Sequence, residues 1–197
     1  MNEIEKVLNL LKKNNRIITT KQVEEIGINN KVLTRMIEKG LIERVAKGVY
    51  IDIKEIEDTY VTSQAICRKG IFSNETALYL HGLSERTPIK YTFTIPSGYN
   101  TKLLKDKKYN FFYSKKEIHE LGTCKVKTPY GNEVIVYDIE RTICDVIKNK
   151  DKLDISIVSS AIKDYLKNKN RDLIKLHSYA KKLNIDKKVS EYLEVLL

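Results

Sequence analysis

Polar side chains that can hydrogen-bond to the edges of DNA bases gather in the first quarter of the chain. Arginine can donate two hydrogen bonds to one guanine, and asparagine or glutamine can pair in the same way with adenine. Arg35 is therefore the best candidate for a guanine contact, and Asn30 or Gln22 could read adenine. Hydroxyl and basic side chains nearby can hold phosphates. The complete set of candidate DNA-contacting residues is Thr20, Lys21, Gln22, Asn30, Lys31, Thr34, Arg35, Arg44 and Lys47.

These side chains need two helices and a hairpin to position them, and the pattern of residues 18–50 predicts these elements in that order. A short helix, a tight turn, a second helix and a small hairpin form a winged helix-turn-helix, which places its second helix in the DNA major groove. We expect Thr20 to cap the first short helix and Gly27 to end it. We expect Asn29 to cap the second helix, which would run from about residue 30 to residue 39.

The second helix is predicted to have a buried face and an exposed face. Four apolar residues recur at helical spacing and are expected to be buried: Val32, Leu33, Met36 and Ile37. The residues expected on the opposite, available face are Asn30, Lys31, Thr34 and Arg35. Ile28 and Leu33 are placed to form a hydrophobic staple across the helix start.

Elements on both sides of these two helices complete the unit. An amphipathic first helix is marked by the apolar residues Ile4, Val7, Leu8 and Leu11. Gly40 ends the second helix, and residues 41–45 and 48–51 predict the two strands of the wing. Thr20 and Lys21, at a helix start, are expected to hold a phosphate. Arg44 and Lys47, in the wing, are expected to touch the DNA backbone or the minor groove.

The charge of the chain favours a polyanionic partner. With 36 Lys and Arg against 26 Asp and Glu, the net charge is +10 and the isoelectric point is near 9.3. Residues 1–52 carry ten basic and seven acidic side chains, a net +3, which leaves +7 for residues 53–197. If DNA is the partner, the second part of the chain should help to bind it. The C-terminal basic residues either extend the positive surface that binds DNA or form only a solvated, Lys-rich surface. These residues are Lys163, Lys167, Lys169, Arg171, Lys175, Lys181 and Lys182.

The second part of the chain predicts an α+β domain that begins at a charged connection near residues 52–57. Its predicted strands are residues 91–95, 109–113, 125–127 and 133–137, of which the last two flank a turn and should form a hairpin. Its predicted helices are residues 56–68, 73–82 with Ser73 as cap, a helix capped by Asp138, and stretches near 153–167, 171–183 and 187–196. The helix after Asp138 should bury Ile139, Ile143, Val146 and Ile147.

Residues that could support catalysis have simpler structural interpretations. The three histidines, His81, His119 and His177, lack the short spacings of metal ligands. Arg141 and Asp145 stand four apart and are expected to form an ion pair on one helix face. Glu75, in the first turn of a helix, is expected to interact with the helix dipole. The sequence has no glycine-rich phosphate loop and no serine nucleophile elbow, so we expect no enzymatic activity and no cofactor.

The cysteines and the hydropathy indicate the compartment. Cys67, Cys124 and Cys144 are odd in number and widely spaced, which favours free thiols in a reducing cytoplasm. No long apolar run predicts a membrane span, and no signal peptide precedes the first predicted helix. We therefore expect a cytoplasmic protein that does not contact a membrane.

Taken together, the motifs resemble the AbiEi-family antitoxins of type IV toxin–antitoxin and phage abortive-infection systems, over nearly the whole chain. The segments that carry the resemblance are residues 18–20, 25–28, 40–50, 73–84, 95–98 and 140–145. One departure is Lys47, where an arginine is expected before the glycine of the wing. Lysine keeps a phosphate contact but loses bidentate geometry.

The resemblance implies a transcriptional autorepressor, with residues 1–52 as the DNA-binding domain and residues 53–197 as the antitoxin domain. The first domain would bind inverted repeats in double-stranded DNA of its own promoter. The second would neutralise a nucleotidyltransferase-like toxin without a stable complex. Because no coiled-coil heptad is present, we expect a monomer in solution and cooperative binding of two copies on adjacent DNA repeats. The alternatives are a two-domain enzyme, such as a nuclease or a toxin-modifying enzyme targeted by its winged helix, and a protein-interaction module.

Overall fold

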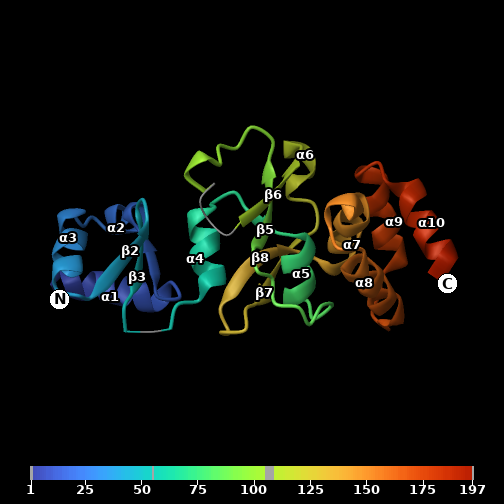
Figure 1. The fold of residues 1–197 in the computed structure, drawn as a ribbon. Coiled ribbons are helices and arrows are strands. Elements are labelled where there is room, and N and C mark those ends of the chain that lie inside the picture. Colours follow the sequence, from blue (N-terminus) through green and yellow to red (C-terminus); the bar gives the residue numbers. More distant parts are fainter. Residues whose placement is uncertain (1, 55, 105–108, 197) are drawn as a thin grey trace. The chain divides into compact units, whose positions relative to one another are not determined.

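The computed structural model describes residues 2–54, 56–104 and 109–196, and it divides into two compact units (Figure 1). Unit 1 contains residues 1–68 and 128–134, and unit 2 contains residues 69–127 and 135–197. The assignment of DNA binding to residues 1–52 and of antitoxin activity to residues 53–197 stays a prediction.

Unit 1 begins with the predicted winged helix-turn-helix, and its elements are α1 (Glu3–Lys13), β1 (Ile17–Thr19), α2 (Thr20–Glu25), α3 (Lys31–Glu38), β2 (Ile42–Ala46), β3 (Val49–Asp52) and α4 (Thr59–Ile66). The three strands form an antiparallel sheet in the order β1-β3-β2. The wing is the β2–β3 hairpin, as predicted. The sequence did not predict β1 as a strand, because three residues are too few to show an alternation.

Neighbouring residues of β1 point to opposite faces of this sheet, as the pleat of a strand requires. Ile18 lies in the apolar core with residues of the three helices α1 to α3, which include Val7, Leu11, Val23, Val32, Leu33 and Met36. Ile17 lies on the other face with Val49 and Ile51, and α4 packs there through Val61, Ala65 and Ile66. The sheet is therefore covered by helices on both faces.

Three details of the helix-turn-helix differ from the sequence-based expectation. Thr19, and not Thr20, caps α2: its Oγ1 accepts from the backbone N–H of Gln22, and its own N–H donates to the Gln22 side chain at 2.8 Å. Asn30, and not Asn29, is the N-cap residue of α3 and makes no side-chain cap bond, while the Asn29 side chain accepts from the N–H of Lys31 at 3.0 Å. Ile37 is 40% exposed, because it lies at the edge of the buried face of α3.

Unit 2 has the α+β class predicted for the second part of the chain, but it begins at residue 69, because the helix predicted over residues 56–68 lies in unit 1. Its strands are β4 (Ile71–Phe72), β5 (Tyr91–Pro96), β6 (Tyr109–Ser114), β7 (Thr123–Lys127) and β8 (Glu133–Tyr137). They form one sheet in the order β6-β5-β4-β8-β7, in which β5 pairs in parallel with β6. The predicted β7–β8 hairpin is confirmed. The two-residue strand β4 was not predicted, yet it lies at the centre of the sheet.

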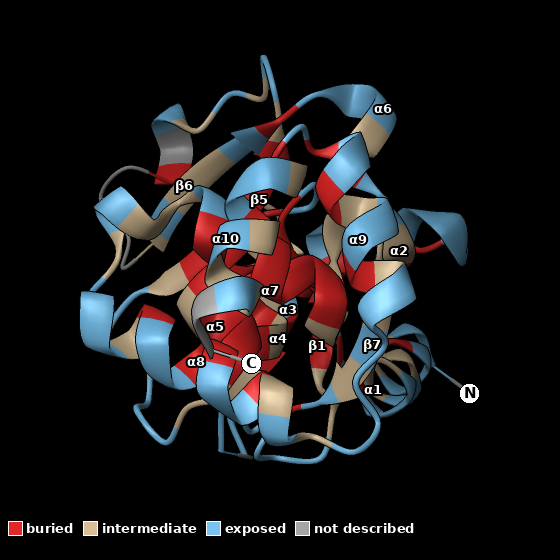
Figure 2. Ribbon diagram, turned by 90° about the vertical axis from the view of Figure 1, so that its right-hand side faces the viewer, coloured by how far each residue is buried: buried red, intermediate tan, exposed pale blue. Residues whose placement is uncertain are grey.

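The helices of unit 2 are α5 (Asn74–Leu80), α6 (Lys116–His119), α7 (Ile139–Lys148), α8 (Ile155–Lys167), α9 (Leu173–Lys182) and α10 (Asp186–Leu196), with short 3-10 turns at Lys102–Leu104 and Lys150–Lys152. Asp138 caps α7 as predicted, since its side chain accepts from the N–H of Arg141. Every residue from Glu140 to Ile147 is buried, and α7 is mostly red in Figure 2. The sequence predicted one buried face for this helix, whereas α5, α8, α9 and α10 together cover it on all sides.

Among the described residues, no helix combines the length and the apolar character that a membrane crossing requires.

Candidate nucleic-acid interface

The polar face of α3 is presented as the sequence predicted. Lys31, Thr34 and Arg35 are exposed, and Asn30, immediately before the helix, is half-buried. The opposite face is held by Val32, Leu33 and Met36, each at most 1% exposed. A short helix that is anchored on one side and polar on the other can enter a DNA groove without losing its packing.

Arg35 is held by a carboxylate from another helix. Its guanidinium lies 3.0 Å from the Glu3 carboxylate of α1, and both side chains are more than half exposed. An exposed ion pair contributes only about 0–1 kcal/mol, so Arg35 can leave Glu3 at a small cost. The pair holds the guanidinium beside α1, and a guanine contact by Arg35 stays a prediction.

The two candidate adenine readers are engaged within the protein. The Oε1 atom of Gln22 accepts from both the N–H and the hydroxyl of Thr19, so it completes the cap of α2. The Nδ2 atom of Asn30 donates to Glu24, and its Oδ1 is buried without a hydrogen-bond partner among the described residues. Either amide must rotate away from these contacts before it can pair with a base. Base reading by Gln22 and Asn30 stays a prediction.

The wing tip is fixed against the start of α2. The carbonyl of Gly48 accepts from the N–H of Thr20 at 3.0 Å, and Gly48 has a left-handed backbone (φ 71°). A Cβ atom at this position would lie 3.0 Å from the Thr20 hydroxyl oxygen, so glycine is needed for the approach. The Thr20 N–H is thus occupied, and a phosphate contact from Thr20 would have to use its hydroxyl.

The candidate phosphate-binding residues Lys47, Arg44 and Lys21 lie on the wing and on α2, which the wing contacts. Lys47 is exposed at the tip, and Arg44 is exposed on β2, where its Nε donates to the Ala46 carbonyl at 3.3 Å. Lys21, on α2, is exposed and lies 3.6 Å from Glu25. The structure therefore leaves all three cations on the surface of unit 1, where phosphates could reach them. Phosphate binding by these residues is untested and stays a prediction.

Neutralising Glu3 is expected to tighten DNA binding. In the Glu3→Gln variant Arg35 does not have to break an ion pair when it binds DNA. The substitution also removes one negative charge near α3, which would repel the DNA phosphates. We expect an affinity roughly two- to fivefold higher, measured by fluorescence anisotropy with promoter DNA. The control is the same substitution in the Arg35→Ala background, where the gain should vanish. An equal gain in both backgrounds would show that Glu3 acts only through general repulsion.

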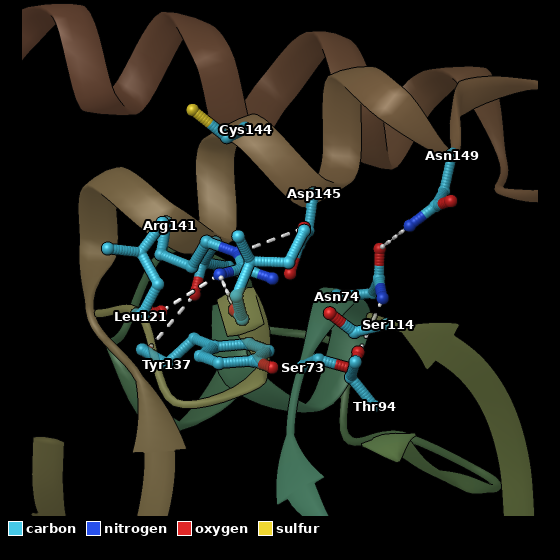
Figure 3. A network of polar contacts seen from close by, with 12 residues as sticks. Ser73, Asn74, Thr94, Ser114, Leu121, Tyr137, Arg141, Cys144, Asp145 and Asn149 are labelled. Carbon is cyan, nitrogen blue, oxygen red and sulfur yellow. Dashed lines mark hydrogen bonds and ion pairs between the residues drawn. The ribbon is translucent and has the colours of Figure 1, made fainter. Parts of the chain in front are cut away.

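The candidate catalytic residues of unit 2 are used for structure. Arg141 is 1% exposed: its Nε lies 3.2 Å from Asp145, as the i,i+4 spacing predicted. Its Nη1 donates to the carbonyls of Ile118 and Leu121 at 2.9 Å each, and its guanidinium lies over the Tyr137 ring (Figure 3). Three of the five N–H donors of Arg141 are thus engaged within the protein, and the buried side chain cross-links α7 to the segment that carries Ile118 and Leu121.

Two of the three histidines contact backbone carbonyls, whereas His177 is exposed. The Nε2 atom of His81 lies 2.7 Å from the Tyr137 carbonyl, and His81 ends α5. His119 is buried beside the Thr94 carbonyl, and burial lowers its pKa. Cys67, Cys124 and Cys144 form no disulfide in the described part of the chain, as predicted, and burial raises the pKa of the Cys144 thiol to about 12. Among the described residues, no three His, Cys, Asp or Glu side chains gather in a way that could hold a metal ion.

A second buried polar network surrounds the start of α5. Asn74 is fully buried with a left-handed backbone (φ 47°), and its Oδ1 accepts from Asn149 at 3.0 Å (Figure 3). Ser73 occupies the predicted cap position of α5, but its hydroxyl accepts from Thr94 at 2.9 Å. Glu75 follows in the first turn, where burial raises its pKa. The first half of the motif, residues 73–78, thus contributes mainly to the interior of unit 2, whereas Gly82 is exposed.

Comparison with known proteins identifies the N-terminal part of the chain. Residues 5–51 match the model of a family described as "Transcriptional regulator, AbiEi antitoxin". The resemblance to AbiEi antitoxins is therefore confirmed for this segment. No curated protein matches the chain. Among solved structures, the crystal structure of the RV2827C protein from Mycobacterium tuberculosis is similar, with 12% sequence identity and a TM-score of 0.48. That similarity covers 94% of this chain and 77% of the other.

Proposed function

We propose that this protein is the antitoxin of a type IV toxin–antitoxin system and that it represses its own operon. The observation that carries the proposal is the winged helix-turn-helix of residues 5–51, which matches the AbiEi antitoxin regulators and presents an exposed polar α3. Its partner is double-stranded DNA at its own promoter. The protein acts in the cytoplasm, as such a partner requires.

In the proposed complex, α3 lies in the major groove and the wing lies against the backbone or the minor groove. Arg35 leaves Glu3 and donates to a guanine, while Lys31 and Thr34 contact neighbouring bases or phosphates. Lys21, Arg44 and Lys47 neutralise phosphates. Two monomers occupy the two halves of an inverted repeat, and their binding is cooperative.

Unit 2 is proposed to carry the antitoxin function against a nucleotidyltransferase-like toxin, without a stable complex between the two proteins. The motifs of residues 73–84 and 140–145 lie in this unit, and they carry the resemblance to AbiEi antitoxins outside the winged helix. Because Arg141, Asn74 and Ser73 are buried, these motifs would act by holding the fold rather than by touching a partner. Neither proposed role requires catalysis.

The first test is binding of the purified chain to its own upstream DNA. We expect it to prefer a fragment that contains the inverted repeats over a scrambled fragment by about 10³-fold or more at physiological salt. Gel-shift titrations should also show a complex that contains two copies, with little of the single-copy complex because binding is cooperative. Equal affinity for both fragments would contradict the proposed repression. Rescue of growth on co-expression with the neighbouring toxin gene tests the antitoxin role separately.

A further inference from the structure

Unit 1 carries an open groove that the sequence did not reveal. It has a volume of about 600 Å³ and is lined by residues from the end of α1, from β1, from α2 and from α4. Three of its lining residues are cationic, namely Lys13, Lys21 and Arg68, and one, Glu25, is anionic. We call this feature the basic groove.

The cations of the basic groove are available to a ligand. Lys13 and Arg68 are exposed. Lys21 pairs with Glu25 at 3.6 Å, but both side chains are more than half exposed, so water screens this pair and it is readily exchanged. Amides and a hydroxyl complete the polar lining: Asn14, Asn15, Gln22, Gln64 and Thr19. Net positive charge with neutral hydrogen-bonding groups is the composition that suits phosphates and sugars.

The wall of the groove at the end of α1 is held in a fixed shape. Asn15 and Arg16 both have left-handed backbones, with φ of 51° and 63°, which is uncommon for residues other than glycine. Asp52 secures this turn, because its carboxylate lies 3.1 Å from the Arg16 guanidinium and its N–H donates to the Arg16 carbonyl. The N–H of Arg16 in turn donates to the Leu11 carbonyl at 2.8 Å.

The opposite wall is α4, which is fixed by its packing. Val61 and Ala65 line the groove and also belong to the apolar cluster with Ile17, Val49 and Ile51. The turn and the packed helix hold the two walls of the basic groove in place. A ligand can therefore bind there without first paying the entropy cost of ordering a flexible segment.

We propose that the basic groove holds the sugar–phosphate backbone of double-stranded DNA and that Lys13 and Arg68 each neutralise a phosphate. This inference rests on the proposed DNA-binding function and extends the contacted surface beyond α3 and the wing. Lys21 connects the two surfaces, because it lines the groove and is also one of the phosphate contacts predicted from the sequence. Contacts of this kind position a protein on DNA but carry no sequence information.

The test uses full-length Lys13→Gln and Arg68→Gln variants, with Lys12→Gln as the matched control. Lys12 is an exposed cation on α1 that does not line the groove. Each groove variant should flatten the slope of log affinity against log salt by about 0.9 and weaken binding by roughly three- to tenfold near 0.1 M salt. Promoter DNA and random DNA should lose affinity by the same factor. Arg68→Lys should keep the wild-type slope.

The outcomes separate this proposal from the proposed function. If the wild type prefers its promoter but the groove variants keep its salt slope, the groove proposal is overturned and the function stands. The groove proposal is also overturned if Lys12→Gln flattens the slope as much, or if only promoter binding is lost. If the wild type shows no preference for its promoter, the proposed repression fails first. Circular dichroism melting of each variant verifies that it is folded.

Discussion

Replacing Arg141 with methionine is expected to destabilise unit 2 by about 3–5 kcal/mol, because the substitution leaves the buried carboxylate of Asp145 without its counter-charge. Asp145 lies 4% exposed on α7, and its Oδ2 already has no hydrogen-bond partner among the described residues. The carbonyls of Ile118 and Leu121 would also lose the Nη1 donor. Urea unfolding followed by circular dichroism measures the loss in free energy of unfolding.

The destabilisation should depend on pH in a defined direction. Burial raises the pKa of Asp145, and the guanidinium of Arg141 opposes this shift. Without Arg141 the folded-state pKa rises further above its unfolded value. A group with a raised pKa stabilises the fold fully below its unfolded pKa, and this contribution is lost as the pH rises through the folded pKa. The free energy of unfolding of the Arg141→Met variant should therefore be closest to that of the wild type near pH 4. The difference between the two should be largest above neutral pH.

The control for this prediction removes both charges. In Arg141→Met combined with Asp145→Leu no buried charge remains, so part of the lost stability should return and the added pH dependence should disappear. If the double variant is no more stable than the single variant at pH 7, the cost lies in packing and in the lost carbonyl contacts rather than in the unpaired carboxylate.

The second large effect concerns DNA recognition. Arg35→Ala is expected to weaken binding to the promoter by about 1–3 kcal/mol, because it removes the proposed bidentate contact with guanine. This corresponds to roughly a 5- to 150-fold lower affinity. One base position of the site should become tolerant of substitution, which a set of single-base variants of the promoter DNA would reveal.

Two further substitutions give this prediction its controls. Arg35→Lys keeps the charge but loses the planar pair of donors, so it should retain non-specific affinity and lose discrimination at the same base. Lys31→Gln removes a neighbouring exposed cation of α3 and should weaken promoter and random DNA alike if Lys31 binds phosphate. An equal loss on both DNAs for Arg35→Ala would mean that Arg35 contacts only the backbone.

The helix-turn-helix was predictable because its signals are local. Gly27 and Gly40 follow their helices with left-handed backbones, the Asn29 side chain accepts from the N–H of Lys31 where α3 begins, and the spacing of Val32 and Met36 identifies the buried face. Each of these signals depends on residues within one or two turns of the chain. The errors were equally local, since the cap of α2 lay one residue earlier, at Thr19.

In unit 2 the sequence identified most helices and strands but not their environment. The period of α7 predicted one apolar face, which is correct for Ile143, Val146 and Ile147. The burial of Arg141 depends on segments outside α7, namely the one that carries Ile118 and Leu121 and the end of β8 with the Tyr137 ring. Nothing within the sequence of α7 indicates that these segments pack on its polar face, so its helical period alone predicts a surface helix.

The sequence by itself determined the fold class, the winged helix and the set of exposed polar residues on α3, because propensity, capping and periodicity act over a few neighbouring residues. Only the tertiary structure decided which partners those side chains have. Arg35 meets Glu3 from 32 positions away, and Lys13, Lys21 and Arg68 meet in one groove, because packing of apolar faces brings distant segments together. The hydrophobic effect has no directional preference, so the spacing of residues in the sequence does not show which distant segments will pack together.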